Sequence, residues 1–117
     1  MSFMLLIIEP TTQRAGRTEA EGRELYARMQ RFGEGLQAQG KLKASESLAS
    51  QASAVRVTTA GGQPRVSDGP FAEAKEMVGG FFLLECASLD EAVAIAHECP
   101  AAEWATVEVR ALAPCYQ

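Results

Sequence analysis

The sequence predicts a single α+β domain, spanning residues 1–117, in which two helices cover one face of an antiparallel sheet. Three observations support this prediction. Apolar or alternating segments typical of strands lie near both ends of the chain. Two capping-box patterns each precede a helical apolar stripe. Between the two helices lie a hairpin signal and a strongly apolar run, so strands and helices are interspersed along the chain.

The first part of the chain predicts a strand followed by a helix. Phe3 to Ile8 is an unbroken apolar run, which is typical of a strand buried on both faces. Thr18 and Glu21 form a capping box. Gly40 is a suitable helix stop. The helix between them carries one apolar stripe, made of Leu25, Met29, Phe32 and Leu36.

The middle of the chain predicts a loop and a hairpin. Lys41 to Ser53 is small and polar, and we expect it to be mostly loop. Val55 to Thr59 is rich in β-branched residues and predicts a strand. After the turn "AGGQ", Arg65 to Ser67 returns as a short second strand. Pro64 indicates that this second strand is short or lies at a sheet edge.

The last part of the chain predicts a strand, a helix and a strand. Gly80 to Cys86 is strongly apolar, and the capping box "SLDE" opens a helix that ends before Pro100. Ala105 to Leu112 alternates between apolar and polar residues, as a half-exposed strand does. The order β-α-β-β-α-β, with one hairpin element short, is the ferredoxin-like arrangement.

The apolar first strand also predicts a partner. It requires cover on both faces, yet the chain has helices for only one face of the sheet. Soluble proteins rarely leave a large apolar face exposed. We therefore expect a symmetric homodimer in which two sheets face each other.

Composition excludes several classes of function. The net charge is −4 and glutamates interleave with the arginines of the first helix, so we expect no nucleic-acid partner. The apolar amino-terminal run is too short to span a membrane and lacks the features of a signal peptide, so we expect a cytoplasmic protein without membrane contact. The three cysteines are widely spaced and His97 is the only histidine, so we expect neither a metal site nor a cofactor.

The segment "SDGPFAEAKEMVGGFF" is the candidate site. Asp68 has two interpretations, because Asp-Gly-Pro is ordinary turn chemistry, whereas carboxylates held close together can supply a general acid or base. Glu73, Lys75 and Glu76 provide the neighbouring charges. The glycine pair that follows indicates a bulge or the close approach of a backbone or ligand.

Other residues would complete such a site. Lys75 or Arg56 would hold an anionic group, and Phe71 with Phe81 or Phe82 would form apolar walls. Phe81 and Phe82 point to opposite faces of their strand, so only one of the two can face the pocket.

The strings "SDGPFAEAKEMVGGFFLLE", "SLDEAVAIAHECPAA" and "VEVRAL" resemble the DGPF branch of the YCII-related family over essentially the whole chain. The resemblance implies a ferredoxin-like fold and a dimeric α+β barrel. Some members are enzymes related to muconolactone-type lyases and isomerases that use a His and an Asp. Asp68 matches the aspartate, but nothing before His97 matches the histidine. Other members are linked to extracytoplasmic-function sigma factors.

Two main hypotheses follow. The first is a homodimer that binds an unknown small molecule and, if it is an enzyme, uses Asp68 for lyase- or isomerase-like acid–base chemistry. The alternative is a non-catalytic regulatory module that acts through protein contact, such as contact with a sigma factor. A third interpretation is that the charged segment only holds the dimer together, with Glu73 and Lys75 paired across the subunit boundary.

Overall fold

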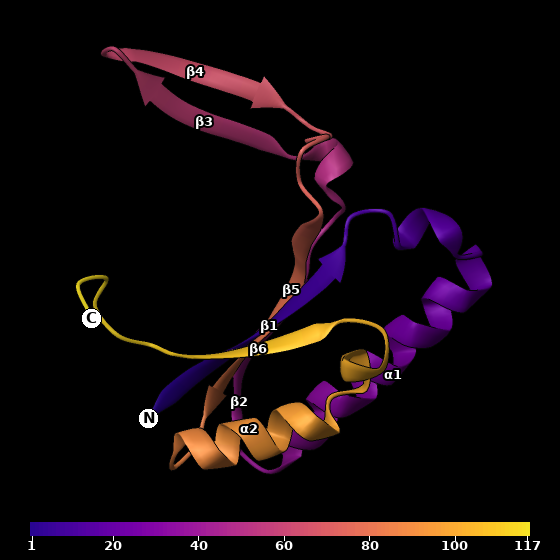
Figure 1. Cartoon of the computed structure of the whole chain (residues 1–117). Helices are drawn as coiled ribbons and strands as arrows, with labels where there is room; N and C mark the ends of the chain where they lie inside the picture. Colours follow the sequence, from indigo (N-terminus) through magenta and orange to yellow (C-terminus); the bar gives the residue numbers. More distant parts are fainter.

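A four-stranded antiparallel sheet carries both helices on one face, and a two-stranded hairpin projects away from it (Figure 1). The computed structural model describes residues 1–117. The sheet order is β2-β5-β1-β6, so the predicted α+β ferredoxin-like fold is confirmed. The elements are β1 (Ser2–Pro10), α1 (Glu19–Ala38), β2 (Leu42–Ser47), β3 (Val55–Ala60), β4 (Gln63–Asp68), β5 (Glu76–Glu85), α2 (Leu89–Glu98) and β6 (Thr106–Ala111).

The core lies between the sheet and the helices. Alternate side chains of β1 point into it, and Phe3 and Leu5 are almost fully buried. Leu84 from β5 and Ile95 from α2 pack in the same cluster. Phe82 meets Phe32 of α1 edge to face, with ring centroids 5.2 Å apart. The apolar stripe of α1 therefore joins the core mainly through its carboxyl-terminal half.

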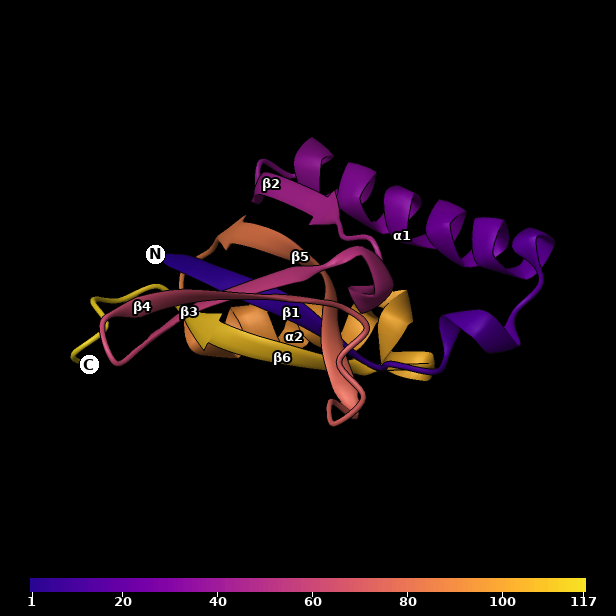
Figure 2. The same ribbon diagram turned by 90° about the horizontal axis from the view of Figure 1, so that it is seen from above.

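The opposite face of the sheet has no helix over it (Figure 2). Met4, Leu6 and Ile8 lie on this open face and are half-buried. The register places Leu6 between Phe81 of β5 and Glu108 of β6. The side chains of Phe81 and Phe82 thus lie on opposite faces, as the sequence predicts. The structure describes one chain, so the dimer stays a prediction.

The predicted loop over Lys41 to Ser53 is wrong for its first half. Leu42–Ser47 forms β2, which pairs with β5 at the edge of the sheet. Most of its residues are small or polar, because backbone hydrogen bonds to one neighbour hold an edge strand, and such a strand needs no regular apolar pattern. The hairpin β3–β4 is real but forms a separate sheet, so β2 is the second strand of the ferredoxin-like order.

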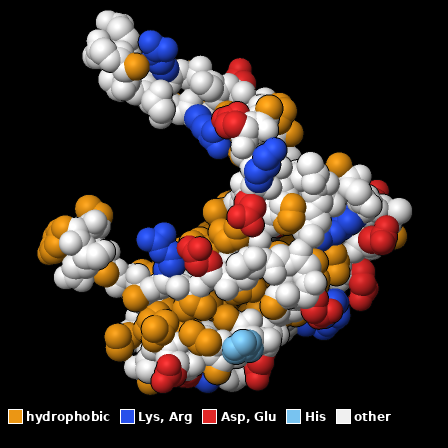
Figure 3. Space-filling model, viewed as in Figure 1, with side chains coloured by type: hydrophobic (Ala, Val, Ile, Leu, Met, Phe, Trp, Pro, Cys, Tyr) orange, Lys and Arg blue, Asp and Glu red, His pale blue; other side chains and the backbone are white.

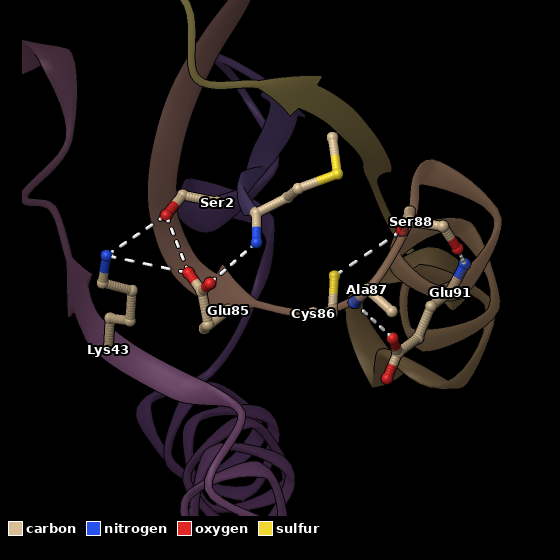
Figure 4. A network of polar contacts seen from close by, with 8 residues as sticks. Ser2, Lys43, Glu85, Cys86, Ala87, Ser88 and Glu91 are labelled. Carbon is tan, nitrogen blue, oxygen red and sulfur yellow. Dashed lines mark hydrogen bonds and ion pairs between the residues drawn. The ribbon is translucent and has the colours of Figure 1, made fainter.

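Both predicted helix starts are confirmed. Thr18 and Glu21 form a complete capping box on α1. Ser88 caps α2, and the carboxylate of Glu91 reaches back to accept a hydrogen bond from the backbone amide of Ala87 at 2.7 Å (Figure 4). These local contacts fix where each helix begins.

The cysteines behave as small core residues or surface thiols. Cys86 and Cys99 are buried, and Cys115 is exposed. Burial raises the pKa of the Cys99 thiol to about 11, so this side chain stays protonated and inert. None of the helices combines the length and apolar character that a membrane span requires.

Candidate functional site

A cleft of about 1050 Å³ opens between α1 and the sheet, and helix residues from Thr18 to Gln37 line it. Residues of β1, β2 and β5 form the floor, and the turn η3 (Pro100–Glu103) with Trp104 closes one side. The wall on α1 includes Gly22, Tyr26 and Met29, one face of the helix. The cleft therefore lies on the helix-covered side of the sheet and borders the core, since Ile7 and Phe82 belong to both.

Two glycines of β5 leave the floor of the cleft without side chains. The register with β1 shifts between Ile7 and Ile8, which leaves Gly79 as an extra residue in β5, a β-bulge. A Cβ on Gly79 would lie 1.8 Å from Oε1 of Glu9, and one on Gly80 would lie 2.9 Å from the carbonyl oxygen of Glu46. The glycine pair is therefore required by close approach, as the sequence predicts.

The side chain of Glu9 lies where a side chain of residue 79 would otherwise be, and it is only 8% exposed. Arg14 pairs with it through two bonds, Nη2 to Oε1 at 2.7 Å and Nε to Oε2 at 3.2 Å. Arg14 also donates to the carbonyl oxygens of Leu48 and Gly79. A buried carboxylate requires such a partner, and the bidentate geometry fixes both side chains at the floor of the cleft.

Arg17 supplies a second cation beside the cleft. Its guanidinium lies 6.0 Å from the ring of Trp104 and forms no ion pair with any carboxylate of the chain. On the same indole, Arg28 lies 5.4 Å from the ring centroid but is paired with Glu103. Arg14 and Arg28 thus have acidic partners in direct contact, whereas Arg17 has no carboxylate in direct contact and acts on Glu21 only from a greater distance.

The cleft therefore combines a buried acid, a free cation and an aromatic wall. Three or more His, Cys, Asp or Glu side chains do not converge anywhere in residues 1–117 in a way that could hold a metal ion. Binding of an organic ligand is the chemistry that these groups suit.

The segment singled out by sequence lies elsewhere, at the base of the hairpin. The guanidinium of Arg56 sits 3.7 Å from the ring centroid of Phe71 and pairs with Glu73 at 3.1 Å. Phe71 is buried. A Cβ on Gly69 would lie 1.9 Å from the carbonyl oxygen of Gln51, so the Asp-Gly-Pro-Phe string packs tightly against the preceding turn. Glu73 thus has a partner within its own chain, which leaves the predicted pairing with Lys75 across a boundary without structural support.

A second cavity, of about 410 Å³, adjoins this base. Arg56, Phe71 and Glu76 line it together with Ile8 and Val78, which belong to the open side of the sheet. The structure therefore brings together three of the residues predicted for the site. Phe82 does not join them, since it lines the cleft under α1.

Asp68 and Lys75 are exposed and line neither the cleft nor the second cavity. The Asp68 carboxylate accepts no hydrogen bond within the chain, so it does not act as the hydrogen-bonding turn residue that its neighbours suggest. Lys75 contributes its backbone carbonyl, which accepts from the amide of Thr11 at 3.0 Å. Their roles in binding or catalysis stay predictions.

Sequence reasoning missed Glu9 and Arg14. The sequence does contain a signal for Glu9. This residue alternates in step with Phe3, Leu5 and Ile7 along β1, so its side chain points to the same buried face of the strand. An acidic residue in register with buried side chains must find a partner or a ligand. Glu9 is an isolated carboxylate at the end of an apolar strand, so a pattern of several charges within one segment does not reveal it.

Polar side chains at the other end of the sheet form a surface network instead of a site (Figure 4). Glu85 accepts hydrogen bonds from the amino group of Met1 and from the hydroxyl of Ser2, and Lys43 lies 3.8 Å from it. The hydrogen bond from the amino group holds the pKa of the Glu85 carboxyl below its usual value. None of these four residues lines the cleft or the second cavity.

Comparison with known proteins assigns the family. The sequence profile of the YCII-related domain matches residues 1–115. The chain belongs to the YCII-related family. An uncharacterised protein of Rhizobium meliloti (strain 1021) is 43% identical over 76 residues, which cover 63% of this chain and 61% of that relative. The match thus spans less than two thirds of the relative's length. The family predicted from the motif strings is confirmed by the profile match.

Proposed function

We propose that this YCII-related protein binds a small organic molecule in the cleft between α1 and the sheet. The observation that carries the proposal is the buried Glu9–Arg14 pair at the floor of a cleft of about 1050 Å³. Ligand sites are typically clefts of about 300–1,000 Å³ with a few fixed polar groups. The bulge at Gly79 exists to make room for Glu9, which is an arrangement that core packing alone would not need.

The lining suggests the chemical class of the ligand. Arg17 would hold a carboxylate or another anionic group, since it lacks an acidic partner. Tyr26, Met29 and Trp104 provide an apolar wall for a carbon skeleton. A small organic acid fits this combination.

Catalysis is a further proposal with two candidate acids. Glu9 is within reach of a ligand in the cleft, but both of its carboxyl oxygens already accept hydrogen bonds from Arg14. Asp68, the aspartate suggested by the family resemblance, would need cover from a second chain to exclude water from its reaction. Lyase- or isomerase-like chemistry would require one of these carboxylates to move a proton.

We also propose that the protein is a homodimer formed through the open face of the sheet. Met4, Leu6 and Ile8 give this face an apolar centre. Glu108 and Arg110 flank them on β6 and have no partner within the chain. A two-fold axis would allow Glu108 of one copy to pair with Arg110 of the other.

The test of ligand binding fills the cleft without disturbing the fold. Gly22 faces the cleft and Gly35 does not, and an added Cβ would meet nothing within 4 Å at either position. Gly22→Met and Gly35→Met therefore gain similar helix propensity, but only the first fills the cleft. A library of small carboxylates is screened against the wild type by ligand-observed NMR, and the hits are titrated against both variants.

We expect the hits to lose roughly tenfold or more in affinity for Gly22→Met, because a filled pocket excludes the ligand, and to bind Gly35→Met as they bind the wild type. Equal affinity for all three proteins would place the ligand elsewhere. Failure of every carboxylate to bind would contradict the proposed ligand class.

The regulatory alternative, including a link to an extracytoplasmic-function sigma factor, makes a different prediction. A stoichiometric protein partner should then be recovered from native lysate equally well with Gly22→Met, since a surface contact does not depend on the cleft.

A further inference from the structure

The β3–β4 hairpin extends from the body of the molecule as an arm, which we define as residues Val55–Asp68 (Figure 1). Every residue of its two strands is exposed except Ala60, which is half-buried. The strands pair only with each other. A lone two-stranded hairpin is marginally stable in water, so the arm needs a surface to pack on.

The two faces of the arm differ in chemistry. Val57 lies directly opposite Val66, and Val55 follows on the same face, since strand residues alternate. These valines are 70%, 67% and 57% exposed, respectively. The other face carries Arg56, Thr58, Arg65 and Ser67. One face of the arm therefore has an apolar centre, with Asp68 opposite Val55 at its base, and lacks a partner within the chain.

The exposed surface area of the chain is larger than that of a compact monomer of the same mass. The chain exposes 7724 Å². A folded monomer of 12.5 kDa exposes about 6200 Å², so the excess is about 1500 Å². A stable protein interface buries roughly 800 Å² on each partner. The radius of gyration, 16.1 Å, likewise exceeds the value of about 13 Å for a compact chain of this length.

The hollow beside the arm suggests which partner fits. Figure 3 shows an open space bounded by the arm, the body of the molecule and the carboxyl-terminal segment. Charged side chains without intrachain partners occur in both signs on these parts, namely Asp68 on the valine face of the arm and Glu108 and Arg110 on β6. Charges of both signs suit a self-complementary contact about a two-fold axis, in which each copy offers both signs.

We propose that the arm is a dimerisation arm, whose apolar face of Val55, Val57 and Val66 packs on a second copy of this chain. The proposal rests on the homodimer proposed above and adds that the sheet faces alone do not hold it. The partner then covers the base of the arm, so that Asp68 and the cavity beside Arg56 and Phe71 face a subunit boundary instead of water.

The test compares two neighbouring positions on opposite faces of the arm. Val57→Glu and Thr58→Glu both replace an exposed β-branched residue by the same charged one, and neither residue belongs to the core or the cleft. The dimer dissociation constant is measured by sedimentation velocity over a range of protein concentrations. Circular dichroism confirms that each variant is folded. Val66→Glu repeats the first substitution on the opposing strand.

We expect Val57→Glu and Val66→Glu to weaken the dimer roughly 100-fold, because the two-fold axis places each added charge in the interface twice. Thr58→Glu should change the dissociation constant by less than about threefold. Unchanged dimerisation of Val57→Glu, or equal weakening by Thr58→Glu, would overturn the arm proposal.

A variant of the sheet separates this outcome from failure of the dimer itself. If Leu6→Lys abolishes a dimer that Val57→Glu leaves intact, the open face holds the dimer and the arm does not. If the wild type is monomeric at every concentration, both the homodimer and the arm proposal fall, whereas ligand binding in the cleft, tested with Gly22→Met, is unaffected.

Discussion

The two helices cover the same face of the sheet in different ways. α2 buries Ala92, Ile95 and Ala96 within 10 residues, whereas α1 buries only Gly33 and Leu36 within 20. Alanines allow α2 to lie close to the strands, and large side chains of β1 and β5 fill the space below it. Below α1 the floor of the cleft includes Gly79 and Gly80, which have no side chains to fill it, so the space stays open. One end of this face therefore provides stability, and the other is free for binding.

The largest change in the free energy of unfolding is expected from a substitution in the packed core. Leu84 is fully buried in the core, so Leu84→Ala should lower the free energy of unfolding by about 2–5 kcal/mol. Leu25→Ala, at the wall of the cleft, should cost about 1 kcal/mol, because this half-buried side chain loses fewer contacts. Urea unfolding of both variants measures the difference. Equal losses would mean that the cleft is closed and packed like the core.

The ion pair at the floor of the cleft should have an intermediate effect. Arg14→Ala leaves Glu9 buried without a cation and should destabilise the protein by about 2–3 kcal/mol. The loss is smaller than for a fully buried pair, because the Arg14 side chain is 32% exposed. Arg23→Ala removes the exposed pair with Glu19 on α1 and should cost less than about 0.5 kcal/mol. Thermal unfolding of the two variants should reveal this contrast, and similar losses would show that Glu9 is hydrated.

The smallest effect concerns the start of α2 and depends on pH. The hydrogen bond from the amide of Ala87, assisted by Lys41, holds the pKa of the Glu91 carboxyl below its usual value. A carboxyl whose pKa is lower in the folded state stabilises the protein above its unfolded pKa, and this contribution disappears as the pH falls through the folded pKa. Glu91→Gln should therefore melt below the wild type at pH 7, and the gap should close in acid, at a pH below the folded pKa of Glu91.

Glu98→Gln is the matched control, since Glu98 is exposed on the same helix and makes no ion pair. Its melting temperature should follow that of the wild type at both pH values. A gap for Glu91→Gln that persists in acid would show that the glutamate contributes through packing and not through its charge.

Local patterns in the chain were sufficient for most of the fold. The capping boxes located both helix starts, and alternating or apolar runs located β1, β5 and β6 within a few residues. The family followed from short strings that depend on residue identity alone. By contrast, β2 escaped detection, because the small polar residues of an edge strand carry no apolar period.

The sequence by itself determined the order of the two helices and of β1, β5 and β6, the alternation of Phe81 and Phe82 between the faces, and the need for glycine before that strand, because each depends on neighbours along the chain. Only the tertiary structure decided that Gly79 is the bulge residue opposite β1 and that Glu9 enters the space it leaves. It also decided that Arg14 and Leu48 meet at the same point. These contacts join four separate segments, and their register is set by the pairing of whole strands and not by any local pattern.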